Sequence, residues 1–355
     1  MKVAPLSPPP LGPSPAHDGG GLATSPRHAR GRGLHGSRPT AHGLLPTFLL
    51  PVLVYFAGFC LLTYPLIRAF PRAFFADAGD GLQNVWNIWW VDLALTRLHA
   101  SPWWTPLLHY PGGVSLVGQT LNPFDGFVGV ALLPWLSLVE TYNAIVVFSF
   151  VMGGVTAFWL ARALGGAHWS SLVGGALFTF ANYHFAHAQG HLQLVALEWL
   201  PLFLLCWRRL LVAPGAWRAL AAAGALLLVQ LCDYYYFFYC VLAGALLLAW
   251  HWWHTGRGRR YLDRARLAAL GVFAVAAAAL TGPLPVALLL LDRRDPLGGE
   301  HPAATFSLDL LAPIIPGGHW RFAPLTADYW SRLPGNIHES SVAVGVSVLL
   351  LLALI

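Results

Sequence analysis

Residues 143–163 form the run NAIVVFSFVMGGVTAFWLARA, in which Arg162 is the only charged side chain. An apolar segment of about 20 residues can cross about 30 Å of hydrocarbon as a helix. Similar runs recur, and 57% of the residues are hydrophobic whereas 10% are charged. A soluble domain carries about 25% charged residues, so much of this surface must face lipid. The runs are continuous rather than alternating, which predicts transmembrane helices.

The basic residues predict how the chain crosses the membrane. Cytoplasmic loops carry an excess of Lys and Arg, which places Arg162, the pair Arg208 and Arg209, and the cluster at 257–266 inside. We predict an all-α integral membrane protein, a polytopic bundle of about eight transmembrane helices. The other apolar runs are 44–67, 126–139, 169–187, 193–212, 217–232, 234–253, 266–291 and 341–355.

One run does not fit this topology as a span. Residues 126–139 are few for a crossing and include Pro134. We interpret this run as a re-entrant or partial helix, and whether it spans stays open. The protein is then a multi-pass protein of the cell membrane, with its N-terminus in the cytoplasm.

The two ends of the chain differ from the apolar middle. Residues 1–43 are rich in Pro, Gly, His and Arg, so we expect a disordered cytoplasmic tail before a transmembrane domain at 44–355. The last run is about 15 residues long and has no flanking anchor. We therefore expect a fragment of a longer protein.

This topology places four polar segments on the non-cytoplasmic side: 68–123, 184–191, 233–236 and 292–338. In the first segment, apolar residues recur every three or four positions between Leu82 and Leu93. That spacing predicts a juxtamembrane amphipathic helix along the membrane surface. Our hypothesis is that the polar residues of these loops converge in one water-accessible pocket.

The first outside loop carries Asp77, Asp80 and Gln83. An acid at the start of a helix is commonly an N-cap. Alternatively, Asp80 is a carboxylate held at the membrane interface as the general base for an acceptor hydroxyl. Gln83, one turn further along the predicted helix, is a candidate substrate contact.

Three histidines, His184, His187 and His191, lie within eight residues. His187 and His191 would share a helix face if the helix continued through Gly190. Such a group can bind a metal, although a carboxylate partner is not evident, or it can hold a phosphate at a helix end. The alternative is a polar turn at the interface.

The remaining candidates are isolated charges near apolar runs. Asp233 lies between two runs, where an ionisable group indicates function unless it lies at the headgroup boundary. Arg293 and Arg294 could hold a lipid-linked phosphate, because the guanidinium offers paired donors, or they belong to a solvated loop. Glu339 is a further substrate contact or an interfacial acid, and Glu198 lies within a run.

The order of these features resembles the GT-C superfamily of membrane glycosyltransferases, which includes the protein mannosyltransferases and the aminoarabinose transferases of lipid A. An N-terminal span precedes an outside loop with an Asp and surface helices, and a bundle of short spans follows. Three motifs are similar to uncharacterised bacterial proteins of this class over about residues 44–355. They are DGLQNVW at 80–86, HFAHAQGHLQLVALEWLP at 184–201 and SLDLL at 307–311.

The resemblance implies sugar transfer from a polyprenyl-phosphate donor to a lipid, glycan or protein acceptor in the cell envelope. Asp80 matches the catalytic Asp of the first loop, or a residue that positions the acceptor. Family members often show two acids here, so the base assignment stays open between Asp80 and Asp77. Arg293 and Arg294 would contact the donor phosphate. No cofactor is implied with certainty and no nucleic acid is expected.

Metal use stays open, since His187 and His191 would contact either the donor or a divalent metal. The alternative function is a non-enzymatic transporter or flippase of lipid-linked glycans. Transporters place their key polar residues near the bilayer midplane in broken helices. Here these residues are expected at the outer ends of spans, which favours the enzyme. A membrane scaffold is a third hypothesis.

Overall fold

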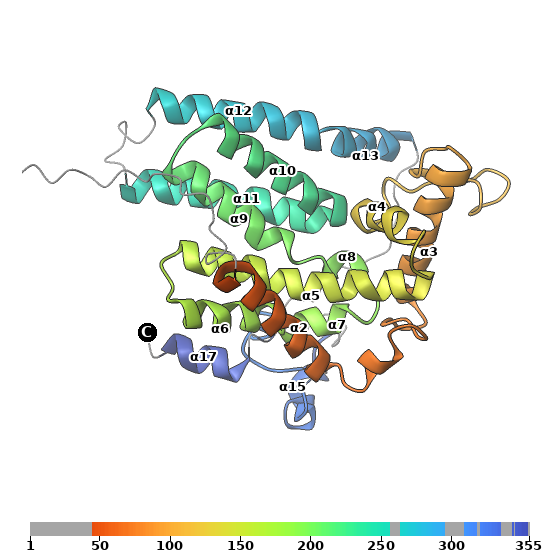
Figure 1. Ribbon diagram of the computed structural model, residues 1–355, viewed down its shortest axis with the longest axis horizontal. Helices are drawn as coiled ribbons and strands as arrows, with labels where there is room; N and C mark the ends of the chain where they lie inside the picture. The colour runs from red at the N-terminus through yellow and green to blue at the C-terminus, as the bar shows by residue number, and fades with distance from the viewer. Residues whose placement is uncertain are drawn as a thin grey trace, which may run out of the picture. The chain divides into compact units, whose positions relative to one another are not determined.

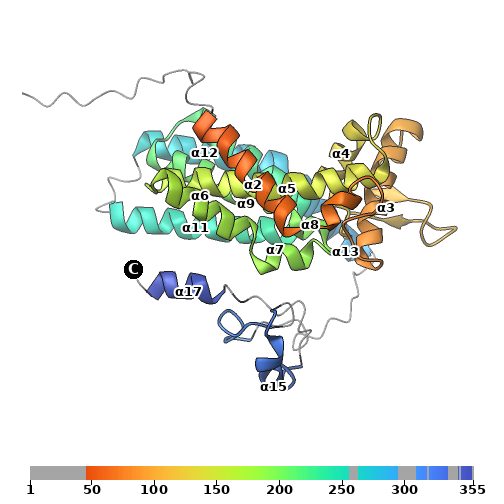
Figure 2. The same ribbon diagram turned by 60° about the horizontal axis from the view of Figure 1, so that its bottom comes forward.

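The computed structural model describes residues 45–255, 263–294, 309–317, 320–334, 343 and 345–353. The predicted N-terminal tail lies outside these residues. The described part is mainly helical, and its one sheet is a short antiparallel pair of β1 (Trp104–Thr105) and β2 (Val114–Ser115). Figures 1 and 2 show the helices from two directions.

The described residues form a series of helices and helical turns. In chain order they are η1 (Leu45–Leu49), α2 (Leu50–Leu62), η2 (Leu66–Ala69), α3 (Asp80–Asp92), η3 (Leu93–Arg97), α4 (Pro123–Leu132), α5 (Leu138–Ala163), α6 (His168–Thr179), α7 (Asn182–His187), α8 (Leu192–Val195), α9 (Trp199–Val212), α10 (Ala216–Cys232), α11 (Tyr234–Thr255), α12 (Arg264–Thr281), α13 (Pro283–Arg294), η5 (Ala323–Leu325), α15 (Ala327–Trp330) and α17 (Val346–Ala353).

Four helical segments among the described residues are long and apolar enough to cross a membrane: Leu45–Leu62, Leu138–Ala163, Tyr234–His254 and Arg264–Thr281. They confirm the helical fold class and indicate a membrane protein, whereas about eight spans stays a prediction. In α5, 61% of the apolar window is buried inside the protein, against 17% in each of the other three. The other three segments therefore leave most of their apolar surface uncovered by the described part of the protein.

Several of the apolar runs are broken in the structure. Run 169–187 forms α6 and α7, and run 193–212 forms α8 and α9. Run 266–291 is divided between α12 and α13 at Gly282, because Pro283 has no N–H to continue the helix but suits the first position of the next one. Run 126–139 contributes most of the ten-residue α4, which is shorter than the four candidate spans.

Small residues let α2, α5 and α6 approach closely. Tyr55 of α2 is fully buried, and its hydroxyl donates to the Leu172 carbonyl of α6 at 3.0 Å. A Cβ at Gly154 of α5 would lie 2.6 Å from the Tyr55 ring, and one at Gly175 of α6 would lie 2.1 Å from its hydroxyl. The Tyr55 ring thus fills the space that two glycines leave, a packing typical of membrane helices.

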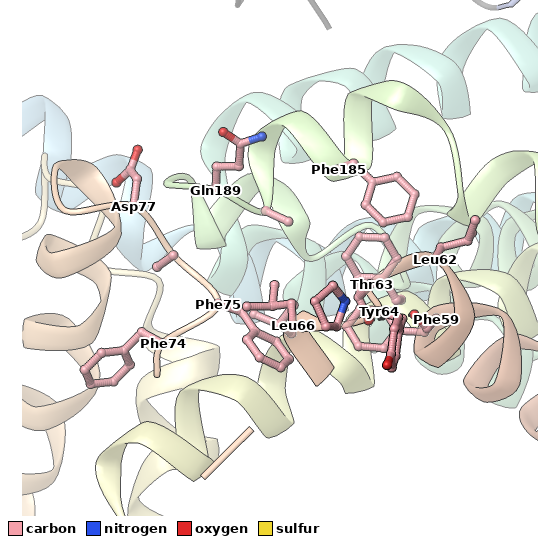
Figure 3. Close-up of a pocket in the computed structure, with 15 residues that line it drawn as sticks. Phe59, Leu62, Thr63, Tyr64, Leu66, Phe74, Phe75, Asp77, Phe185 and Gln189 are labelled. Carbon is pink, nitrogen blue, oxygen red and sulfur yellow. Dashed lines mark hydrogen bonds between the residues drawn. The ribbon is translucent and has the colours of Figure 1, made fainter. Parts of the chain in front are cut away.

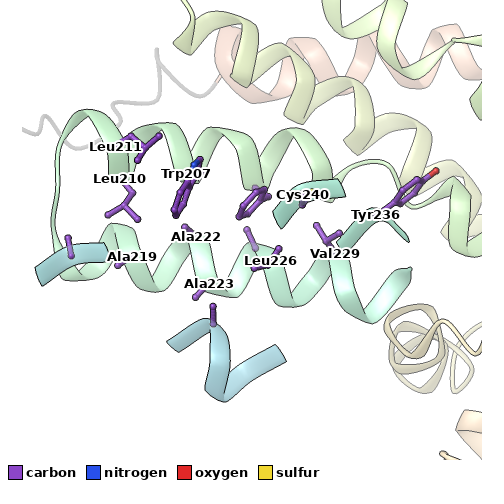
Figure 4. Close-up of a cluster of buried hydrophobic side chains, with 14 of the residues drawn as sticks. Trp207, Leu210, Leu211, Ala219, Ala222, Ala223, Leu226, Val229, Tyr236 and Cys240 are labelled. Atoms are coloured by element: carbon purple, nitrogen blue, oxygen red, sulfur yellow. The ribbon is translucent and has the colours of Figure 1, made fainter. Parts of the chain in front are cut away.

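A second cluster joins α9, α10, α11 and α12 (Figure 4). The Trp207 indole of α9 donates to the Gly244 carbonyl of α11 at 2.9 Å, which satisfies a buried N–H. Ala219, Ala222 and Ala223 of α10 are fully buried and bring the neighbouring backbones close.

A helix is present where one was predicted from residue 80 onward, as α3 and η3, whereas its position along a membrane surface stays a prediction. Its apolar face packs on α4, where a Cβ at Gly126 would lie 2.6 Å from Val91 and one at Gly129 would lie 2.5 Å from Ile88. The pairing of α3 with α4 therefore depends on glycine at these two positions. Helix α3 is held in place by this contact at one face and by polar bonds at its start.

We expect Gly154→Ala to destabilise the protein by about 1–3 kcal/mol, because the added methyl group overpacks the Tyr55 ring. Thermal unfolding in lipid nanodiscs measures the effect. The matched control is Gly224→Ala in α10, where nothing lies within 4 Å of the added Cβ. Gly224→Ala should leave the stability unchanged or raise it, because alanine has a higher helix propensity than glycine. An unfolding temperature that falls equally in both variants would contradict this packing.

Candidate functional site

Asp77 organises the start of α3. Its Oδ1 atom accepts hydrogen bonds from the N–H groups of Gly79 and Gly81, each at 3.0 Å. These are donors that the first turn of a helix leaves without an intrahelical partner. Asp77 therefore acts as the cap of α3, and Asp80 is free of that role.

The turn between α7 and α8 lies against this capped end. The Asp77 N–H donates to the Gln189 carbonyl, and the Asn84 amide donates to the carbonyls of Asp80 and Gly190 at 3.0 and 2.8 Å. A Cβ on Gly190 would lie 3.0 Å from the Asp77 carboxylate. Two segments separated by about a hundred residues are thus fixed to each other through main-chain groups.

This arrangement brings Asp80, His191 and His187 into one row. His191 Nε2 lies 3.2 Å from Asp80 Oδ2, and His191 Nδ1 lies 3.3 Å from His187 Nδ1. Asp80 is 66% exposed and His191 is 29% exposed, so the pair is open to water. If His191 donates from Nε2 to the carboxylate, its Nδ1 can accept from the Nδ1–H of His187.

His184, the first of the three histidines, has a different position. It is fully buried and stacks on Phe150 with ring centroids 3.7 Å apart. Its ring nitrogens lie 2.8 and 2.9 Å from the carbonyls of Thr179 and Val195. The His184 side chain therefore connects the end of α6 to α8. Among the described residues, no three His, Cys, Asp or Glu side chains cluster as a set of metal ligands.

An apolar cavity of about 490 Å³ ends at the same turn (Figure 3). We name it the Phe75 cavity. Phe59 and Leu62 of α2 and Phe185 of α7 line its apolar part, whereas Asp77 and Gln189 line its polar part. The cavity can hold a hydrocarbon chain, and its polar end adjoins the Asp80–His191 pair through Gly190.

Gln83 and Asp233 do not line the Phe75 cavity. The Gln83 amide donates to the Thr120 hydroxyl at 3.0 Å. Asp233 caps α11, because its Oδ1 accepts from the Tyr236 N–H at 2.8 Å. Burial raises the pKa of Asp233 above its ordinary value, and the N–H groups of Tyr236 and Tyr235 oppose that shift.

The other predicted site residues are farther from these contacts or outside the described chain. Arg293 and Arg294 are exposed at the end of α13, and none of the ion pairs within the described chain joins them to Asp80 or His191. Glu339 lies outside the described residues. In the motif at 307–311, the Asp309 carboxylate accepts hydrogen bonds from the Tyr329 hydroxyl and from the Leu311 N–H. These two bonds hold the pKa of Asp309 below its usual range.

Some buried polar residues near this region were not predicted from the sequence. Asp125 is 2% exposed and accepts from the Asn122 amide at 2.5 Å. Gln193 and Gln230 are 6% and 2% exposed. Each is a single polar residue within an apolar stretch, so no spacing distinguishes it in the sequence.

The fold and the site together define a helical membrane protein with a polar site where helix ends meet an apolar cavity. The chain belongs to the family described as domain of unknown function (DUF6311), which matches residues 53–355. Comparison with curated proteins and with solved structures found no match to the chain.

The two acids of the first loop should differ in their effect on stability. We expect Asp77→Ala to lower the free energy of unfolding by about 0.5–2 kcal/mol, because the cap of α3 is lost. Asp80→Ala removes only an exposed pair and should cost no more than about 1 kcal/mol. Chemical denaturation in mixed micelles measures both. A larger loss for Asp80→Ala than for Asp77→Ala would contradict these roles.

Proposed function

We propose that the protein is a membrane glycosyltransferase of GT-C type, which moves a sugar from a lipid-phosphate donor to an acceptor on the non-cytoplasmic side. The observation that carries this proposal is the position of the Asp80–His191 pair beside the polar end of the Phe75 cavity. A lipid-linked substrate needs an apolar groove that ends at a water-accessible reacting group. The described residues offer both within one local structure.

In the proposed reaction the acceptor hydroxyl oxygen attacks the anomeric carbon of the donor sugar. The bond from that carbon to the phosphate oxygen breaks, and the lipid phosphate leaves with the electron pair. The Asp80 carboxylate takes the hydroxyl proton as general base. His191, which lies within hydrogen-bond distance of Asp80, holds the carboxylate in position, and His187 extends the row away from the reacting atoms.

The contacts favour Asp80 over Asp77 as the base. Asp77 Oδ1 already accepts two main-chain N–H groups, so proton uptake there would break the cap of α3. Asp80 is the first residue of α3 and is largely exposed. A mobile acceptor can therefore reach its carboxylate.

The departing phosphate needs cations, which can come from two places. Arg68 and Arg72 are exposed, and they lie in the segment between Leu66 and Phe74, two residues that line the Phe75 cavity. Arg293 and Arg294 are the residues predicted from the sequence as contacts for the donor phosphate. A guanidinium from either pair would meet the phosphate with paired donors.

One observation supports the alternative of a transporter or flippase for lipid-linked glycans. The apolar run 266–291 is broken at Gly282–Pro283, and the freed Thr281 carbonyl accepts from the Gln230 amide at 2.9 Å. Broken helices that offer main-chain groups to buried polar side chains are a feature of transporters. The two functions differ in whether a glycosidic bond forms.

Sugar transfer by the purified protein in lipid vesicles tests the proposal, with polyprenyl-phosphate sugars as donors. We expect Asp80→Asn to lower the rate by about 10²–10⁴-fold, because the general base is lost. Asp92→Asn, on the same helix and away from these contacts, is the matched control and should keep the wild-type rate. An Asp80→Asn variant with the wild-type rate would remove Asp80 from the mechanism. Movement of the lipid across the vesicle without transfer would favour the flippase.

A further inference from the structure

A second cavity, of about 330 Å³, lies where the segment before α4 meets the junction of α10 and α11. We name it the Gln193 cavity. It is separate from the Phe75 cavity, and the two share no lining residue. Its lining includes Trp103, Thr120, Gln193, Gln230, Asp233 and Leu288.

Two glutamines in this lining have hydrogen-bonding groups that the protein does not use. Gln193 is 6% exposed, and no described donor reaches its Oε1. Gln230 is 2% exposed; its amide nitrogen donates to the Thr281 carbonyl, while no described donor reaches its Oε1. A buried carbonyl without a donor costs about 1–3 kcal/mol. A ligand that donates hydrogen bonds would recover this free energy.

The charge of the lining limits what the ligand can be. No Lys, Arg or His is among the residues that line the Gln193 cavity, whereas Asp233 contributes a carboxylate. A phosphate would therefore meet an acid and no cation. Trp103 and Tyr234 add aromatic surface to the two carboxamides. Amides can both donate and accept, so this combination suits hydroxyl groups on a compact ring.

The cavity adjoins the Asp80–His191 pair through two connections. Thr120 lines the cavity and accepts from the amide of Gln83, which lies on α3 one turn after Asp80. Gln193 lies in α8, two residues after His191. A group in the Gln193 cavity would thus contact residues one step removed from the Asp80–His191 pair, and none of the residues that line the Phe75 cavity.

We propose that the Gln193 cavity binds an uncharged, hydroxyl-rich glycosyl group through Gln193, Gln230 and Asp233. The assignment of this glycosyl group to a transfer reaction rests on the proposed function, whereas the binding chemistry rests on the cavity itself. The group is either the sugar of the lipid-linked donor or a glycan acceptor. The lipid phosphate stays outside the cavity.

Saturation-transfer NMR on the full chain in lipid nanodiscs tests this proposal without any catalysis. The probes are methyl α-D-glucopyranoside, methyl α-D-mannopyranoside and inorganic phosphate. We expect at least one glycoside to bind, and Gln193→Leu and Gln230→Leu each to weaken it roughly 2- to 10-fold through one lost hydrogen bond. Phosphate should not compete. The control Asn182→Leu changes an exposed amide on α7 and should bind like wild type.

Gln193→Leu should unfold at a temperature no lower than wild type, since it removes a buried carbonyl that no described donor reaches. A second variant, Gln193→Glu, keeps the shape of the side chain and should also weaken binding. Wild-type affinity in these variants, no glycoside binding at all, or competition by phosphate would each overturn the assignment. If the protein binds a glycoside through Gln193 but shows no transferase activity, the assignment of the Gln193 cavity is supported and the proposed glycosyltransferase function is rejected. If a lipid-linked donor displaces the bound glycoside, the cavity holds the donor sugar. If it does not, the cavity holds the glycan acceptor. Both results support glycosyl binding in the Gln193 cavity.

Discussion

The site depends on the close contact between the start of α3 and the turn that contains Gly190. The Asn84 side chain joins the carbonyls of Asp80 and Gly190, and the Asp77 main chain bonds to Gln189. There is no room at Gly190 for a larger residue beside the Asp77 carboxylate without a shift. Because these bonds are formed mainly by backbone and amide groups, they set the position of Asp80 and His191 independently of their charge.

The same contact places the polar end of an apolar cavity near the exposed Asp80–His191 pair. Helix α5 is the most buried of the four candidate spans, and α2 packs on it to form one wall of the Phe75 cavity. The polar end of that cavity is made by Asp77 and Gln189, which belong to the two segments in contact. The Gln193 cavity is lined by Gln193 of α8, the helix that follows this turn.

Much of this arrangement was visible in the sequence where the pattern is long. The 3–4 spacing after residue 80 predicted α3, and the apolar runs predicted helices in a membrane. The break at Pro283 had a signal, since proline cannot continue a helix, but the run was treated as continuous. The sequence predicted that polar residues of the outside loops converge, but not which of them pair. The contact of Asp80 with His191 depends on hydrogen bonds between distant segments. Gln193 and Gln230 were missed because only their buried environment makes a single glutamine informative.

The central claim is tested most directly by a disulfide between the two segments. A Cβ at Gly190 would lie 3.4 Å from Asp77 Cγ, the place of a cysteine sulfur at position 77, so these positions suit a disulfide. The pair Asp77→Cys and Gly190→Cys would be introduced after replacement of the native cysteines, Cys60, Cys206, Cys232 and Cys240. Mild oxidation in membranes should cross-link this pair within one chain. The pair Asp92→Cys and Gly190→Cys, about 18 Å further along α3, should stay reduced. Equal cross-linking of both pairs, or none at 77 and 190, would contradict the account.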